Sequence, residues 1–162
     1  MEEPPKFIAD EMNGDLARWL RIMGFDCLYI TGKNIDNILL EKTLSTDRIL
    51  LTGDKELFRK VIKRGGKAIY TQGRSLEEKF ESIIEKIDLS KWIGKLPYRC
   101  SICNEVLIKI KPEDLDDTPE YVRERYEYIW YCKNCNKIYW EGSHWKKIKE
   151  MVKCIKSLAK RK

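Results

Sequence analysis

Two C-x-x-C pairs constrain the second half of this chain more than any other feature. Cys100 and Cys103 form the first pair, and Cys132 and Cys135 form the second, 28 residues further on. Each pair can place two thiolates on one metal ion. Together they supply the four tetrahedral sulfur ligands that structural zinc prefers, and an iron centre is chemically possible with the same set. Because sulfur would fill all four positions, we expect this zinc to hold the fold together and perform no chemistry.

The part of the chain before these cysteines alternates between strand and helix patterns. Short apolar runs predict strands at 7–9, 27–30, 49–52 and 67–70. Apolar residues at helical spacing predict helices from residues 16, 38, 55 and 76. Ser75 and Glu78 form a capping box ahead of the last helix. This alternation predicts an α/β unit with a mainly parallel sheet flanked by helices over 1–95. A small zinc ribbon with a basic amphipathic helix then covers 96–162.

Three aspartates lie where strands end or helices begin. Asp10 and Asp54 each follow a strand, and Asp36 opens the helix between them. If the two strands are neighbours in a parallel sheet, Asp10 and Asp54 meet at the edge where α/β proteins bind ligands. Each aspartate alone is explained as a helix cap. Together, their hard oxygen ligands suit Mg²⁺ or Mn²⁺, either of which could support hydrolysis of a phosphodiester bond.

Positive charge is concentrated at the end of the chain. Residues 146–162 carry eight basic side chains against Glu150 alone, which indicates a polyanion partner, although basic tails also serve solubility alone. Each candidate RNA contact has an ordinary structural explanation as well: a solvated helix face for the arginines, and packing in or around the ribbon for the histidine and tryptophan. The candidates are Arg18, Arg21, His144, Trp145, Lys146 and Lys147.

The sequence has neither a long apolar run nor a basic secretory start. No stretch of about 18 apolar residues occurs, and the first residues, MEEPPKF, are acidic. We therefore expect a cytoplasmic protein without a membrane span.

Several motifs, taken in order, resemble the Mut-seven C-terminal RNase family. They are FIADEMNGDLARWLRIMGFD, RILLTGDKEL, the two C-x-x-C pairs and YWEGSHW. This resemblance implies a PIN-like domain fused to a zinc ribbon, with metal-dependent ribonuclease activity. It also implies that Asp10, Asp36 and Asp54 are the metal ligands. The chain departs from the family at Gly53, where arginine is usual, and shows no clear fourth acid, Glu77 and Glu78 being the nearest candidates.

Three functions compete on these grounds. The first is a Mg²⁺- or Mn²⁺-dependent ribonuclease whose ribbon and basic tail hold the RNA. The second is a non-catalytic module that binds RNA or another partner and whose aspartates are helix caps. The third, a phospho-receiver domain, would explain Asp10-Glu11 as an acidic pair but leaves the cysteines without a role.

Overall fold

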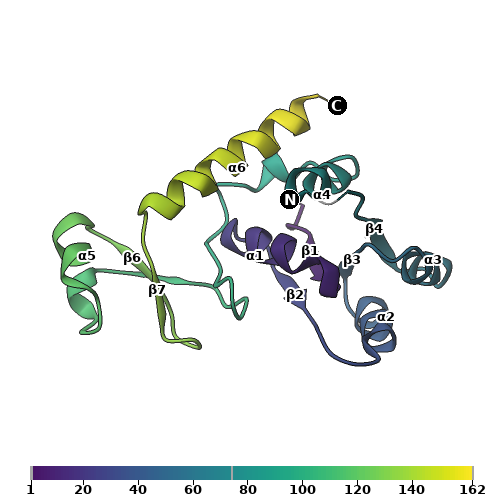
Figure 1. The fold of residues 1–162 in the computed structure, drawn as a ribbon, viewed down its shortest axis with the longest axis horizontal. Helices are drawn as coiled ribbons and strands as arrows, with labels where there is room; N and C mark the ends of the chain where they lie inside the picture. The colour runs from purple at the N-terminus through teal and green to yellow at the C-terminus, as the bar shows by residue number, and fades with distance from the viewer. Residues whose placement is uncertain (1, 74, 162) are drawn as a thin grey trace.

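A computed structural model describes residues 2–73 and 75–161, except for the side chains at positions 143 and 144. Figure 1 shows two parts, a layered α/β unit and a smaller extended sheet, with a long helix that runs from one to the other. The elements of the α/β unit are β1 (Lys6–Ala9), η1 (Glu11–Asn13), α1 (Gly14–Ile22), β2 (Cys27–Tyr29), α2 (Ile35–Ser45), β3 (Arg48–Thr52), α3 (Lys55–Lys63), β4 (Lys67–Tyr70), α4 (Leu76–Ile84) and η2 (Leu89–Lys91).

The four strands form a parallel sheet in the order β2-β1-β3-β4. Ile8 of β1 lies opposite Leu28 on one side and Leu50 on the other. The chain therefore moves outward from β1 in one direction to β2 and in the other to β3. The carboxyl ends of β1 and β3 lie side by side at this reversal, which is where open α/β sheets bind ligands. The predicted parallel sheet is confirmed.

Successive side chains of each strand point to opposite faces of the sheet and pack into two separate cores. Phe7 and Leu51 are fully buried on the face covered by α1 and α4. Ile8 and Leu50 are fully buried on the opposite face, under α2 and α3. Both faces of a parallel sheet need such cover, and burial of each large apolar side chain contributes about 1.5–3 kcal/mol. Figure 1 shows the resulting three layers.

The cysteine-containing part forms a second sheet, which is antiparallel. Its order is β5-β6-β7, and Cys132 ends the central strand. The acidic stretch between the cysteine pairs includes a short 3-10 helix and continues into a short helix. The elements of this part are β5 (Ile108–Ile110), η3 (Pro112–Asp114), α5 (Glu120–Arg125), β6 (Ile129–Cys132) and β7 (Lys137–Tyr139).

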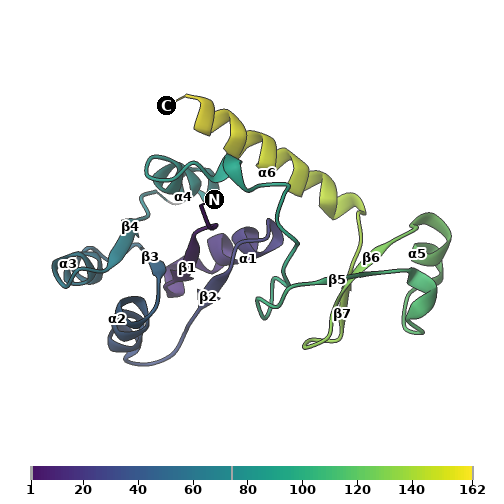
Figure 2. The same ribbon diagram turned by 180° about the vertical axis from the view of Figure 1, so that it is seen from behind.

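Helix α6 (Ser143–Lys160) follows the antiparallel sheet, which we call the ribbon, and lies against the α/β unit, as both views show (Figures 1 and 2). Ile155 is fully buried in the core beside α4 and η2, and Met151 and Val152 pack against the same core. Lysines cover the other sides of the helix, so the expected amphipathic helix is present. Among the described residues, no helix is both long and apolar enough to cross a membrane.

Candidate functional site

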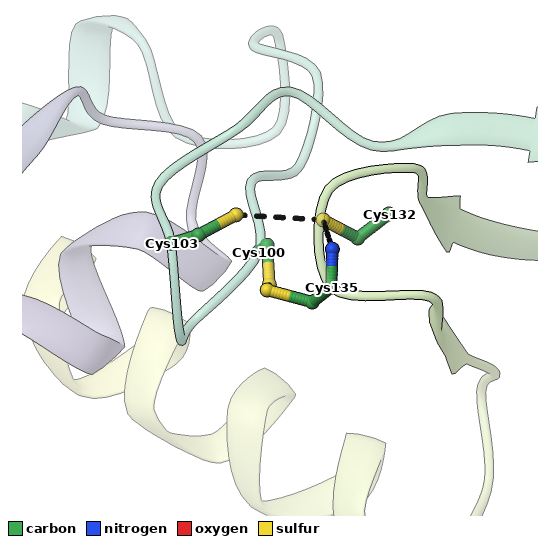
Figure 3. A group of neighbouring side chains, drawn as sticks. All are labelled: Cys100, Cys103, Cys132 and Cys135. Carbon is green, nitrogen blue, oxygen red and sulfur yellow. Dashed lines mark hydrogen bonds between the residues drawn. The ribbon is translucent and has the colours of Figure 1, made fainter.

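The four predicted cysteines meet in one cluster between the antiparallel sheet and the α/β unit (Figure 3). Their sulfur atoms all lie within 4.8 Å of one another, and none of the four forms a disulfide. The Sγ atoms of Cys103 and Cys132 are 3.4 Å apart, and those of Cys100 and Cys135 are 3.9 Å apart. Four thiolates about 2.3 Å from one zinc ion have sulfur–sulfur separations of about 3.8 Å. The cluster therefore has the composition and dimensions of a structural zinc site.

Each cysteine pair is followed by an asparagine in the left-handed backbone conformation. Asn104 has a φ of 76° and Asn136 a φ of 54°. Asparagine tolerates this conformation better than most residues do. It reverses the chain directly after each C-x-x-C pair, so that the two thiols of a pair face the same point.

The environment of the thiols favours a bound cation. Hydrogen bonding to Cys103 and burial together raise the pKa of Cys135 to about 12. Burial also raises the pKa of Cys100, but hydrogen bonds from the Tyr139 hydroxyl and the backbone N–H of Cys103 outweigh it and lower that pKa to about 7. Four thiolates cannot share this space without a positive charge between them, and a divalent ion supplies that charge.

Polar contacts fasten the first cysteine pair to the α/β unit. Arg21 is only 6% exposed and donates from Nε to the Cys27 carbonyl and from Nη1 to the carbonyls of Ser101 and Ile102. The side chain of Asn104 accepts from the Cys27 N–H and donates to Asp26 at 2.7 Å. The cluster thus holds the end of α1 and the start of β2 in place.

At the carboxyl edge of the parallel sheet, Asp10 is 6% exposed and its carboxylate is hydrogen-bonded on both oxygens. Oδ1 accepts from the Asn13 amide at 2.9 Å. Oδ2 accepts from the Thr52 hydroxyl at 2.7 Å and from the Gly53 N–H at 3.1 Å. Because a buried carboxylate is tolerated only when donors satisfy it, this network fixes Asp10 at the end of β1.

Asp54 follows Gly53 on the turn after β3 and is the N-cap of α3. Its Oδ1 accepts from the backbone N–H groups of Glu56 and Leu57 at 2.9 and 3.2 Å. Its own N–H donates to the Thr52 hydroxyl at 3.0 Å, so Thr52 links Asp54 to Asp10. Among the described residues, no group donates a hydrogen bond to Oδ2 of Asp54. The expected cap is present, and one oxygen of the half-buried side chain stays available to a ligand.

Asp36 lies in the first turn of α2, where its side chain is exposed and lines a shallow depression with Glu11 and Asn34. In the described part of the chain, only the cysteines form a group of three or more ligand side chains within 4.8 Å of one another. Asp10, Asp36 and Asp54 therefore lie at strand ends or helix starts without forming such a group, and their role as metal ligands stays a prediction.

Two residues of the Asp10 network were not predicted from the sequence as site residues. Asn13 is fully buried, and its amide also donates to the Leu51 carbonyl and the Thr71 hydroxyl. Thr52 is fully buried as well. Only their positions in the sequence could have predicted this network. Thr52 ends β3 and Thr71 directly follows β4, at the same edge of the sheet where Asp10 follows β1.

The candidate RNA contacts have different surroundings. Arg18, Lys146 and Lys147 are exposed. The sequence places Arg21 on the polar side of α1, but its guanidinium is buried against backbone carbonyls, so we leave it out of any RNA surface. Trp145 is 7% exposed and stacks on Trp130, as expected for a packing residue of the ribbon. The side chain of His144 lies outside the described residues, so its role as an RNA contact stays a prediction.

The two departures from the family pattern are Gly53, whose N–H belongs to the Asp10 network, and the missing fourth acid. A Cβ on Gly53 would be 3.4 Å from the exposed Met12 side chain, an ordinary contact, so a larger residue has room here. Glu77 and Glu78 are exposed on the first turn of α4, and the Ser75 hydroxyl donates to Glu78 at 2.9 Å. Glu78 thus serves the helix start, and the predicted N-cap Ser75 is confirmed.

Comparison with known proteins gives one match. A family model described as the Mut7-C RNAse domain matches residues 5–152. No curated protein and no solved structure matches the chain significantly.

Proposed function

The chain belongs to the Mut7-C RNAse domain family, and on this premise we propose that it is a ribonuclease that hydrolyses RNA phosphodiester bonds on a PIN-like fold. In this proposal Mg²⁺ or Mn²⁺ binds at the carboxyl edge of the parallel sheet, held by Asp10 and Asp54 with Asp36 beside them. The cysteine cluster holds a structural zinc ion. The ribbon and the exposed lysines of α6 contact the RNA.

The observation that carries the proposal is the hydrogen-bonded link between Asp10 and Asp54 through Thr52. It links two acids that follow different strands, β1 and β3, at the point where the strand order reverses. A fold that needed Asp54 only as a cap would have no reason to bury a second carboxylate against the same turn, since burial of an ionised group has a free-energy cost.

The residues fit a Mg²⁺ or Mn²⁺ ion by their chemistry. All three candidate ligands are carboxylates, the oxygen donors that hard cations prefer. Mg²⁺ commonly binds through only one or two carboxylates and keeps several waters. In this proposal Oδ2 of Asp54, which accepts no hydrogen bond from the described residues, and the carboxylate of Asp10 would act as such a pair. When bound, the ion would supply Lewis-acid stabilisation of the phosphate and a more acidic water.

The chain's own residues would position the substrate. Asn13, Thr52 and the Gly53 N–H keep Asp10 in one orientation, which preserves the geometry between catalytic cycles. Arg18 is exposed one helical turn after Gly14, on the helix that starts beside this edge. Its guanidinium would hold a neighbouring phosphate without selecting a base.

A second function, RNA binding without cleavage, is supported by specific contacts. Asp54 already accepts two backbone hydrogen bonds as a cap. Gly53 has no positively charged side chain, unlike the arginine that is usual at this position in the family. If these acids serve only the fold, the protein binds RNA through its basic surface and leaves it intact.

Cleavage of an end-labelled RNA by the purified chain distinguishes the two functions. The wild type is compared with Asp54→Asn in Mg²⁺, in Mn²⁺ and without added divalent ion, with zinc content measured for each sample. Asparagine caps a helix about as well as aspartate does, so this variant removes the ligand charge and keeps the cap. Asp47→Asn is the matched control, because Asp47 is an exposed residue just before the opposite end of β3, paired with Lys67.

Divalent-ion-dependent cleavage by the wild type and by Asp47→Asn, together with loss of cleavage in zinc-loaded Asp54→Asn, would support the nuclease. Equal RNA binding by all three chains without cleavage would overturn it in favour of the binding module.

A further inference from the structure

A pocket of about 280 Å³ lies where the ribbon meets the end of α1 and the first turn of α6. Its walls include Tyr98, Tyr139 and Trp140, all half-buried, and the buried Trp145. The proposed cleavage site lies elsewhere, at the start of α1. The nuclease chemistry proposed above therefore leaves this pocket without a role.

The pocket has the size and lining for one small aromatic group. Pockets for drug-sized ligands begin at about 300 Å³, so this one suits a smaller group. Three of its four aromatic side chains are only half-buried, so part of each is accessible from the pocket. Gly142 contributes to the shape, because a Cβ there would lie 2.9 Å from Nε1 of Trp140 and displace the indole.

The charges around the pocket suit an anion attached to that group. Lys137 and Arg99 are among the lining residues, and none of the described residues that line the pocket is acidic. Arg99 already donates from Nε to the Gly24 carbonyl and from Nη1 to the Asn104 carbonyl, so Lys137 is the cation available to an anion. Lys137 is exposed, with its ammonium 5.2 Å from the centre of the Tyr139 ring.

Helix α1 leads from the proposed cleavage site to this pocket. Gly14, Arg18 and Ile22 follow one another at intervals of four residues, so they lie along one side of the helix. Gly14 begins α1 beside Asp10, Arg18 is exposed in the middle, and Ile22 lines the pocket. Eight residues of α-helix span about 12 Å, which a stacked strand covers in about four nucleotides at about 3.4 Å each.

We propose that this pocket binds one unpaired base of the RNA, with its phosphate held by Lys137, within about four nucleotides of the cut bond. The inference rests on the proposed function for the identity of the ligand. A base stacked on these aromatics would be bound with little sequence preference, because every base has a face that stacks.

An abasic scan tests the pocket without relying on activity. The full chain carrying Asp54→Asn is titrated with labelled single-stranded RNAs that are only as long as the path from Asp10 to the pocket, so that the strand cannot change its register. Each RNA lacks the base at one position, and affinity is measured by fluorescence anisotropy. We expect a loss of about tenfold at one position and little change elsewhere. Trp140→Ala should abolish the difference between intact and abasic RNA at that position. Tyr128→Ala, an exposed aromatic of the ribbon outside the pocket, should leave it unchanged.

A second pair of variants covers the case in which Trp140→Ala fails to fold. Lys137→Gln should weaken RNA binding more than Lys133→Gln, which removes the same charge from the same ribbon outside the pocket. A flat abasic profile in the parent chain, as expected if the pocket docks a protein, would overturn the inference, as would equal effects of the two lysine variants.

Cleavage is measured separately on the chain with Asp54 intact. A position-specific abasic effect without cleavage would remove the nuclease proposal alone, and cleavage with a flat profile would remove the pocket alone.

Discussion

The Thr52 hydroxyl donates a 2.7 Å hydrogen bond to Oδ2 of Asp10, across the neighbouring strands β3 and β1. The same hydroxyl accepts from the N–H of Asp54 at 3.0 Å. One fully buried side chain therefore sets the position of both candidate ligands. The geometry of this edge depends on Thr52 as much as on the acids themselves.

Replacement of Thr52 by valine keeps the shape and removes the hydroxyl. We expect the free energy of unfolding to fall by about 2 kcal/mol, because Asp10 loses a donor and the Asp54 N–H loses its acceptor in a buried place. Cleavage should fall as well, since the Asp10 carboxylate loses one of its three donors and the turn that carries Asp54 loses its hydrogen bond to the Thr52 hydroxyl. Urea denaturation and an RNA cleavage assay measure the two effects.

Thr43→Val is the control for this variant. Thr43 is also buried, but its hydroxyl only donates to the Leu39 carbonyl one turn earlier in α2. It should lose some stability and keep full activity. Equal activity of Thr52→Val and Thr43→Val would contradict the positioning role of Thr52.

The cysteine cluster should contain one zinc ion per chain. Cys103→Ser removes one of the four sulfur ligands, so we expect zinc content to fall and the ribbon to lose its structure, because structural zinc sites contribute folding free energy directly. Cys154→Ser is the control, since Cys154 lies on α6 outside the cluster. Elemental analysis and circular dichroism follow the metal and the fold.

Zinc bound equally by both variants would show that the cluster is not the binding site. Iron in place of zinc, visible by its absorbance, would support the other metal that these ligands can hold.

Acid should weaken the contact between the ribbon and the α/β unit. Burial raises the pKa of Asp26, but hydrogen bonds from Arg48 and Asn104 outweigh it, so the pKa lies below its usual value. A carboxyl whose pKa falls on folding stabilises the protein above its unfolded pKa and loses that contribution as the pH falls through the folded pKa. At pH 7 we expect Asp26→Asn to reduce the free energy of unfolding by about 2 kcal/mol.

Below about pH 4 the difference between the wild type and Asp26→Asn should shrink, because the wild-type carboxyl also becomes neutral. Zinc loss in acid affects both chains, so the difference between them reports on Asp26. Asp47→Asn provides the comparison, because the pair of Asp47 with Lys67 has the same 2.8 Å separation but is exposed. Its effect should be much smaller and should vanish in high salt. A pH-independent difference for Asp26→Asn would rule out this origin.

The regular elements could be predicted from the sequence because their signals are local. Strand and helix patterns predicted the four parallel strands, and the spacing of Cys100, Cys103, Cys132 and Cys135 predicted the cluster, since few other arrangements use that pattern. The position of Arg21 could not be predicted. Its partners Ser101 and Ile102 lie 80 and 81 residues further along the chain, and helical periodicity contains no information on them.

The polar network around Asp10 escaped prediction for a related reason. Asn13 is the last residue of η1 and the N-cap position of α1, where asparagine ordinarily indicates a cap or a turn. Its burial depends on Thr71, which is 58 residues away. For Asp36, a position at a helix start predicts proximity to the sheet edge without fixing how close the side chain comes, so its role stays a prediction.

The two arginines of α1 give a paired test of RNA binding against folding. Arg18 is exposed, whereas Arg21 is buried and donates to three backbone carbonyls. Arg18→Gln should lower RNA affinity and reduce the salt dependence of binding by about one counterion, with the free energy of unfolding unchanged within about 0.5 kcal/mol. Arg21→Gln should lower the free energy of unfolding by about 2–3 kcal/mol, since it leaves those carbonyls without a charged donor.

Each arginine variant controls for the other, because both remove one positive charge from the same helix. Binding is measured by fluorescence anisotropy at several salt concentrations and stability by urea denaturation, at temperatures where both variants are folded. If Arg21→Gln lowered RNA affinity as much as Arg18→Gln while remaining folded, the distinction between a surface arginine and a buried link would fail. If Arg18→Gln left the salt dependence unchanged, the RNA would not pass along α1, and the surface that holds the strand would have to be sought on α6.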